Sequence, residues 1–382
     1  MALDLQVLAK RLKLAREIQA HEVNVVSQAT DIAFERLNQI ESGETQPSGD
    51  EVLILANFYR CDFRDFLDHS RPEPFAQTEI LYRRHGDDFQ PEDRQAIQEF
   101  LFLCEIEAFL ETELEIQKQR FPFTPSGRYF KAHGETAASA LRSFLGYAQN
   151  AIPRDVFADF RRIGFHVFRR RLTNSNISGL YIDHPVAGHC LLVNYEEDTY
   201  RQRFSVSHEA AHAIFDSSDS VVVSYRNNNG RHSEEKLKEI RANRFASCYL
   251  MPPDQLPRVP QWTREQAVYW AQRLRVSTAA LSIALSEAGV VTKEVAETIR
   301  SVKVPMAEKI DPEAPTSLNK KQQFRRLALL EKGLSDYYVG LCFDAYHRGI
   351  ISAGRLSEAL LADHAETREI SILFGRSIQY GD

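Results

Sequence analysis

Apolar residues recur every three or four positions along most of the chain, which is the spacing of an amphipathic helix. Residues 1–70 follow this pattern with short polar breaks, and residues 90–120 are predicted to form one long helix. Ile97, Leu101 and Cys104 lie on a recurring face of that helix, with Ala108 and Phe109 further along. The pattern is helical again over residues 291–382, so the chain is expected to be mostly helical.

Short apolar runs without helical spacing lie between these helical parts and favour β-strands. They cover residues 164–172, 180–182 and 190–194, and two long helices are expected after them, around 203–216 and 234–250. Residues 180–184 or 189–194 are the candidates for an edge strand that pairs with an extended peptide. The predicted fold class is therefore α+β, mostly α, with a small sheet in the middle of the chain.

Breaks in these patterns divide the chain into four predicted parts. Residues 1–70 form a helical bundle, and residues 71–140 form a linker and the long helix; paired prolines at Pro72 and Pro74 disfavour helix at the start of this part. Residues 141–290 hold the sheet and the two long helices. Residues 291–382 are a C-terminal helical region, for which core packing or dimerisation is the simplest role.

Composition narrows the class of protein. No apolar run approaches the roughly 20 residues that a membrane span needs, and the N-terminus lacks the apolar core of a signal peptide. The five cysteines are scattered and odd in number, which argues against a disulfide framework or a cysteine metal site. A formal net charge of −6 predicts no general attraction to nucleic acid. We therefore expect a cytoplasmic protein that does not bind membranes.

A metal site is predicted by two histidines four residues apart. On a helix, His208 and His212 project from the same side and can bind one zinc ion. Glu209 lies about 100° further round the helix, where it can reach a water on the open side of the metal and act as general base. Such an HExxH match also occurs by chance on amphipathic helices. Here its flanks are apolar, so three buried polar side chains would need a partner that a metal provides.

The second long helix supplies the candidate for a third ligand. Glu239 opens a stripe of small and apolar residues, which suits close packing against the histidine helix. With Glu239 the site has three protein ligands and one position left for water. Glu235 is the alternative ligand, and Asn243 is a candidate to support the ligands from behind. Zinc is the expected ion, although two histidines and one carboxylate also suit manganese or another divalent ion.

Two motifs in order carry a resemblance to a known family. Residues 203–212, RFSVSHEAAH, followed by residues 239–246, EIRANRFA, and by LMP at 250–252, resemble the ImmA/IrrE metallopeptidases. The resemblance covers about residues 150–290 and implies a zincin-like domain. It implies that His208, His212 and Glu239 bind the metal and that Glu209 is the catalytic base. Ala211 and Arg241 depart from the family, which often has glycine and an acidic residue at these positions.

The same resemblance indicates a function. Members of this family cut protein substrates such as transcriptional repressors, in stress responses or in the control of mobile elements. The chain is therefore expected to be an endopeptidase acting on a regulatory protein.

The N-terminal part carries a second resemblance. Val23, Val26 and Ala29 mark one short helix, and residues 32–43 mark the next, which predicts a helix-turn-helix. Residues 5–68 resemble the Xre or lambda-repressor type, a match carried by LNQIESGE at 37–44 and QPS at 46–48. The residues expected to face a DNA groove are Ala33, Phe34, Arg36, Asn38 and Gln39.

Charge complicates this DNA-binding prediction. Residues 1–70 contain seven lysines and arginines and twelve aspartates and glutamates, a poor balance for neutralising phosphates. The alternative is that this part binds protein or another copy of the chain. At the level of the whole protein, the alternative to a peptidase is a DNA-binding regulator whose peptidase-like domain senses or oligomerises without turnover.

Overall fold

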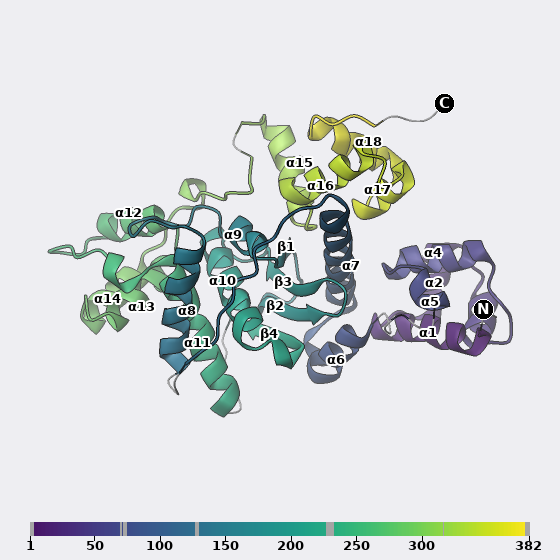
Figure 1. Cartoon of the computed structure of the whole chain (residues 1–382), viewed down its shortest axis with the longest axis horizontal. Helices are drawn as coiled ribbons and strands as arrows, with labels where there is room; N and C mark the ends of the chain where they lie inside the picture. The colour runs from purple at the N-terminus through teal and green to yellow at the C-terminus, as the bar shows by residue number, and fades with distance from the viewer. Residues whose placement is uncertain are drawn as a thin grey trace.

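The computed structural model describes residues 4–68, 71, 75–126, 130–226, 233–315 and 317–378. Helices dominate these residues, and one small mixed sheet lies in the middle of the molecule (Figure 1). The predicted fold class, α+β and mostly α, is confirmed.

The sheet consists of β1 (His166–Arg170), β2 (Ile177–His184), β3 (Gly188–Asn194) and β4 (Val221–Tyr225), in the order β1-β3-β2-β4. β1 is parallel to β3, and the other two pairs are antiparallel. The prediction that β2 or β3 is an edge strand was wrong, because β4 pairs with the outer side of β2. β4 follows the first long helix and itself forms the edge of the sheet.

One of the two long helices covers a face of the sheet, and the other packs behind it. α10 (Thr199–Phe215) packs against β2 and β3, and α11 (Ser233–Leu250) packs against both α10 and α8 (Phe130–Phe144). Asp198 caps the start of α10 by accepting a hydrogen bond from the backbone N–H of Tyr200. Both helices confirm the sequence-based prediction, although α10 begins four residues earlier than expected. Their apolar residues share one core with α9 (Val156–Arg162), α12 (Arg264–Leu274), α13 (Thr278–Glu287) and α14 (Lys293–Ser301).

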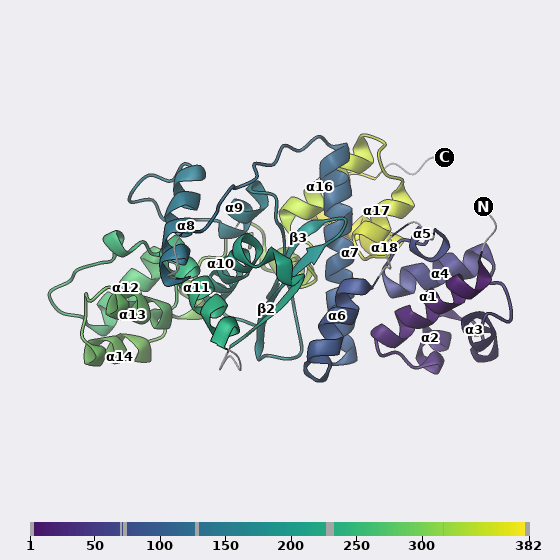
Figure 2. The ribbon, with the colours of Figure 1, turned by 60° about the horizontal axis from the view of Figure 1, so that its bottom comes forward.

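The opposite face of the sheet is covered by α7 (Pro91–Glu113), which separates it from the N-terminal helices (Figures 1 and 2). The predicted long helix ends at Glu113 rather than near residue 120, since Glu115 has a positive φ of 57° that ends the helix. Apolar residues of α7, of the sheet and of the C-terminal helices belong to one buried cluster. The C-terminal helices are α15 (Lys320–Leu330), α16 (Asp336–His347), α17 (Ala353–Ala359) and α18 (His364–Leu373).

The N-terminal helices have a buried cluster of their own. They are α1 (Leu5–Ile18), α2 (Val23–Thr30), α3 (Phe34–Glu41), α4 (Gly49–Tyr59) and α5 (Arg64–Leu67), and α6 (Ala76–His85) leads on to α7. Arg94 of α7 donates a hydrogen bond to the carbonyl of Ile18 (2.9 Å), and Gln98 donates one to the carbonyl of Arg60 (3.2 Å). These contacts tie the N-terminal helices to α7.

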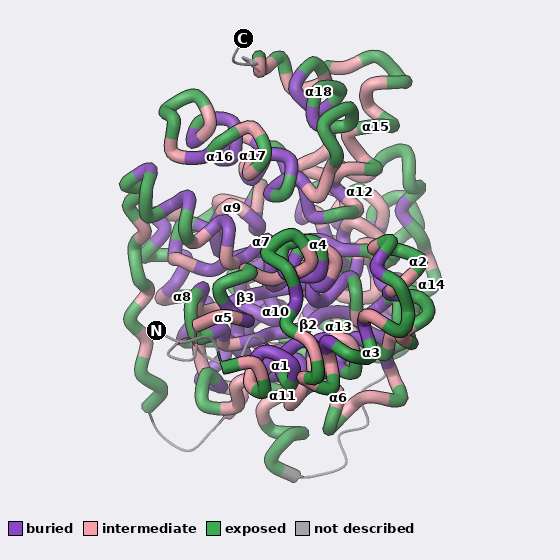
Figure 3. The backbone as a smooth tube through the Cα atoms, turned by 90° about the vertical axis from the view of Figure 1, so that its right-hand side faces the viewer, coloured by how far each residue is buried: buried purple, intermediate pink, exposed green. Residues whose placement is uncertain are grey.

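Viewed from the N-terminal side, buried residues gather in the middle of the molecule and exposed residues form much of its outline (Figure 3). Four short 3-10 turns complete the described elements: Gly86–Asp88, Ser217–Asp219, Pro253–Gln255 and Met306–Glu308. Among the residues described above, no helix has the length and apolar character to cross a membrane.

Candidate metal centre

The helical repeat of α10 brings His208 and His212 together on its buried face. Their Nε2 atoms lie 3.1 Å apart. Two ligand atoms at about 2.0–2.1 Å from a tetrahedral zinc ion are separated by roughly 3.3 Å. The two imidazoles are therefore already spaced as ligands of one ion.

Glu239 of α11 completes the group. Its Oε2 lies 3.4 Å from Nε2 of His208, and its Oε1 lies 3.4 Å from Nε2 of His212. The three ligand atoms form one of two described clusters that could hold a metal ion. Glu235, the alternative ligand, is exposed and is not part of this cluster. Two histidine nitrogens and a carboxylate that reaches both of them form a ligand set that suits zinc.

Neighbouring side chains orient both imidazoles. Nδ1 of His208 donates a hydrogen bond to Oδ1 of Asn243 (3.1 Å), and Nδ1 of His212 donates one to Oδ2 of Asp216 (2.9 Å). Each ring therefore turns its Nε2 toward Glu239, as a metal ligand requires. Asn243 was a candidate for this role on sequence grounds, but Asp216 was missed. The sequence feature that could have identified Asp216 is its position four residues, about one helical turn, after His212.

Arg241, where the resembling family often has an acid, contacts Asp216 rather than a ligand atom. Its Nη2 forms a short ion pair with Oδ1 of Asp216. Its guanidinium also lies over the rings of Phe215 (4.4 Å) and Phe130 (4.9 Å). The cation is thus held by the carboxylate that orients His212, and it supports the site instead of competing with a metal.

The charges around the three ligands favour a cation. Burial alone would lower the pKa of His212, but its hydrogen bonds to Asp216 and Glu239 raise the pKa to about 10. Burial opposes ionisation of Glu239 as well, yet the two histidines hold the pKa of that carboxyl well below its usual range. The carboxylates of Asp216 and Glu239 are therefore ionised, and their negative charge favours the binding of a cation.

Glu209 lies beside this group on the same helix and is fully buried. Within the described residues, neither of its carboxylate oxygens accepts a hydrogen bond of normal geometry, and the nearby hydroxyl of Ser224 on β4 only partly offsets the effect of burial on the Glu209 pKa. Burial raises the pKa of Glu209. A buried carboxylate without partners is costly, so it marks a place where a further polar group belongs.

A cleft of about 860 Å³ opens over His208, Glu209 and Glu239. Its walls come from α10, α11, α13 and the segment after α14, and β4 borders it through Ser224, Tyr225 and Arg226. An edge strand beside the three candidate ligands is a place where an extended peptide can add a strand.

A second cluster of possible ligands consists of Glu107, Glu111 and His166, all buried. Lys118 already contacts Glu111 at 2.6 Å, and the hydroxyl of Tyr337 donates a hydrogen bond to the same oxygen (2.5 Å). The ammonium group of Lys118 supplies positive charge beside Glu111, although Oε2 of Glu107 has no hydrogen-bond partner among the described residues.

The residues expected to face DNA lie on or just before α3. The four that are exposed are Ala33, Phe34, Asn38 and Gln39. Arg36 instead donates two hydrogen bonds to the carboxylate of Glu51, both at 2.8 Å, and one to the carbonyl of Gln46 (2.9 Å). Its guanidinium is therefore engaged within the chain.

Comparison with known proteins bears on the part of the chain that holds the metal centre. No curated protein matches the chain. A family model described as the IrrE N-terminal-like domain, Peptidase_M78, matches residues 160–286, which include the sheet, α10 and α11. These residues are similar to a metallopeptidase-like domain of the IrrE N-terminal-like type, which supports the resemblance to the ImmA/IrrE family.

Proposed function

We propose that the chain is a zinc-dependent endopeptidase whose ligands are His208, His212 and Glu239 and whose general base is Glu209. The observation that carries this proposal is the convergence of two Nε2 atoms 3.1 Å apart with the carboxylate of Glu239, which has one oxygen 3.4 Å from each of them. The buried carboxylate of Glu209 lies beside this group and, within the described residues, accepts no hydrogen bond of normal geometry. Asn243 and Asp216 act through the ligands by keeping each Nε2 directed inward.

When bound, zinc would polarise the scissile carbonyl and lower the pKa of a water molecule. Glu209 accepts the proton of that water at a carboxylate oxygen and passes it on to the leaving amine. β4 orients the substrate by pairing with its backbone along the cleft.

The substitution Glu209→Gln tests this function. It removes the base and leaves the three ligands, so zinc content is expected to stay near one ion per chain while hydrolysis falls by about 10²–10⁴-fold. His208→Ala is the matched control, since it should lose zinc and activity together. Elemental analysis and peptide hydrolysis measure both quantities, and undiminished hydrolysis by the Glu209 variant would refute the assignment. Manganese in place of zinc would appear in the same elemental analysis.

The family resemblance extends the proposal to the substrate, a regulatory protein such as a transcriptional repressor. Co-expression with repressors from neighbouring genes should yield shortened repressor in the presence of the active chain only. The Glu209→Gln variant is the control, and intact repressors in both cultures would speak against this class of substrate.

We further propose that α3 contacts DNA, which makes the chain a peptidase with a helix-turn-helix. The exposed Asn38 and Gln39, next to each other on α3, support this role. The engagement of Arg36 and the acidic balance of residues 1–70 predict weak binding with few phosphate contacts. A salt titration on promoter DNA tests it, and no salt-dependent binding at low ionic strength would exclude the role.

A further inference from the structure

The cleft over the metal centre is lined by more positive than negative charge. Among the described residues, seven lysines and arginines line it, whereas the acidic lining residues other than Glu209 and Glu239 are Asp198 and Glu287. The basic residues are Lys131, Arg201, Arg226, Arg244, Arg300, Lys303 and Lys309. This excess is unexpected in a chain whose formal net charge is −6.

The excess of positive charge is concentrated at one end of the cleft. Near α13, Lys131 contacts Glu287 at 2.9 Å, and Arg244 contacts both Glu287 (3.1 Å) and Glu135 (2.6 Å). Two cations and two acids balance there, so this end of the cleft has little charge to offer a ligand.

The end of the cleft near the start of α10 is different. Arg201 and Arg226 share one carboxylate, that of Glu197, with contacts of 2.7 and 3.3 Å. The side chain of Glu197 is fully buried, whereas those of Arg201 and Arg226 are 44% and 32% exposed. One buried negative charge therefore serves two guanidinium groups that face solvent, and net positive charge remains.

The facing wall, residues 300–309, adds to this charge. Lys303 is exposed and has no ion-pair partner within the described part of the chain. Arg300 forms an ion pair with Glu297 at 3.7 Å, and both side chains are more than half exposed. Lys309 pairs closely with Asp198, which lines the cleft at this end.

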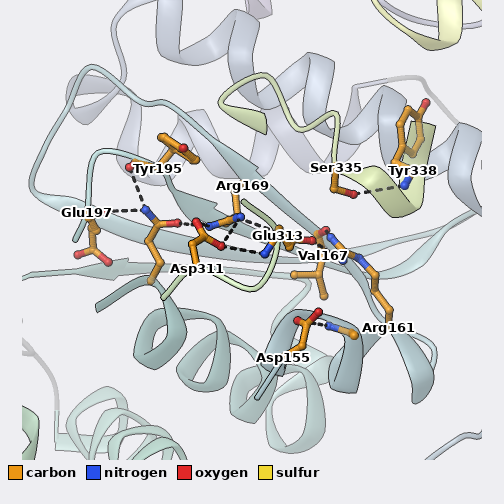
Figure 4. Close-up of polar contacts among 12 residues, drawn as sticks. Asp155, Arg161, Val167, Arg169, Tyr195, Glu197, Asp311, Glu313, Ser335 and Tyr338 are labelled. Atoms are coloured by element: carbon orange, nitrogen blue, oxygen red, sulfur yellow. Dashed lines mark hydrogen bonds and ion pairs between the residues drawn. The ribbon is translucent and has the colours of Figure 1, made fainter. Parts of the chain in front are cut away.

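This basic wall is held in place at both ends. The hydroxyl of Thr278 donates a hydrogen bond to the carbonyl of Val302 (2.5 Å). Beyond Lys309, the buried guanidinium of Arg169 contacts Asp311 (2.8 Å) and Glu313 (2.9 Å), and Arg161 contacts Glu313 (2.6 Å). Figure 4 shows the carboxylates of Asp311 and Glu313 beside the guanidinium of Arg169 on β1. The lysines are thus presented on a fixed wall, which lowers the entropic cost of binding an anion.

We propose that this cleft selects peptide segments with acidic side chains on the side of the scissile bond that lies over Arg201, Arg226 and Lys303. This proposal rests on the peptidase function proposed above and names its substrate class. β4 ends at Tyr225 and is followed directly by Arg226. A peptide strand paired with β4 therefore runs from the metal centre toward the basic end. Glutamate or aspartate there pairs with guanidinium and ammonium groups that lack full partners.

Binding to the inactive Glu209→Gln protein, loaded with zinc, tests this selection without requiring turnover. The probes are two fluorescent peptides of one sequence, one with three glutamates beside an apolar residue and one with three glutamines instead. Fluorescence anisotropy should show about tenfold tighter binding of the acidic peptide at low salt, a preference lost at about 1 M salt. Equal binding of the two peptides would overturn the proposal, whether or not the protein proves to be a peptidase.

Two variants locate the effect. Lys303→Glu should abolish most of the preference for the acidic peptide, and Arg226→Gln should reduce it while Arg201 keeps Glu197 paired. Lys320→Glu, an exposed lysine at the start of α15 outside the cleft, is the charge-matched control and should keep the full preference. An equal loss with Lys320→Glu would show general electrostatic attraction and contradict selection by the cleft.

Discussion

Gly179 of β2 lies where any larger residue would meet the candidate base. A Cβ atom at this position would come within 2.8 Å of Oε1 of Glu209 and 2.8 Å of the backbone carbonyl of Leu192. The absence of a side chain therefore leaves the space into which the buried carboxylate fits. A role of this kind follows from contacts between β2 and α10, so the HExxH spacing could not reveal it.

We expect Gly179→Ala to displace Glu209 and so to lower peptide hydrolysis by about 10²-fold while zinc content is retained. Replacing glycine by alanine usually favours the folded state by about 0.4–1 kcal/mol, but overpacking costs about 1–3 kcal/mol and should outweigh that gain. Denaturant unfolding measures the cost. In a Glu209→Ala background the cost should shrink, and an identical cost in both backgrounds would show that Glu209 is not the residue displaced.

Asp216 combines a local contact, to His212 one helical turn earlier, with a tertiary contact to Arg241 of α11. Its carboxylate joins His212 to Arg241, so Asp216→Asn removes the charge that keeps the imidazole oriented and its Nε2 basic. We expect zinc affinity to fall about 10–100-fold, measured by competition with a chelator. Asp219→Asn is the matched control, because Asp219 contacts Lys238 and no ligand. Equal affinity of the Asp216 variant and the unmodified protein would disprove this role.

At the scale of the elements, the metal centre depends on how closely α11 approaches its neighbours. On one side α11 packs against α10, which carries both histidines, and on the other it packs against α8. The approach to α8 is close because Gly134 has no side chain: a Cβ there would lie 2.5 Å from the carbonyl of Arg241 and 2.9 Å from the backbone nitrogen of Phe245. The helix that carries Glu239 is therefore positioned by α8 as well as by α10.

Gly134→Ala should destabilise the protein even though it lies within a helix. Helix propensity favours alanine by about 1 kcal/mol, but contacts with backbone atoms cannot relax without moving α11, at a cost of about 1–3 kcal/mol or more. We expect a lower free energy of unfolding and weaker zinc binding. Gly340→Ala within α16 is the control, since its nearest neighbour is a side-chain atom at 3.8 Å, and it should be neutral or stabilising. If both variants behave alike, α8 does not set the position of α11.

For the whole molecule, α7 connects three parts that the pattern of the sequence separates. Glu99 of α7 contacts Arg60 of the N-terminal helices (3.8 Å) and forms a short ion pair with Arg170 of β1. The same helix packs against α16 of the C-terminal region. The metal centre lies on the other face of the sheet, within a different buried cluster.

This separation predicts that zinc stabilises one part of the molecule selectively. At a free concentration of about 1,000 times its Kd, zinc contributes about 4 kcal/mol to the state that binds it. Removal by a chelator should therefore increase hydrogen exchange in α10 and α11, with little change in α1–α5. Mass spectrometry of proteolytic peptides measures this, with the His208→Ala variant as control. A uniform increase over the whole chain would contradict local stabilisation.

Local periodicity determined much of this protein. The helices around α10 and α11, the shared face of His208 and His212 and the stripe headed by Glu239 follow from a repeat of 3.6 residues, which neighbouring positions impose on one another. The mostly helical fold with a small sheet could be predicted for the same reason.

Tertiary structure alone decided the rest. β4 comes about forty residues after its partner β2, and no local pattern shows that it covers that edge. Gly179 and the basic wall of residues 300–309 acquire their roles from segments distant in the sequence. The physical reason is that the spacing of apolar residues shows which face of a helix or strand is buried. It does not show which other element packs against that face, because this depends on contacts between residues distant in the sequence.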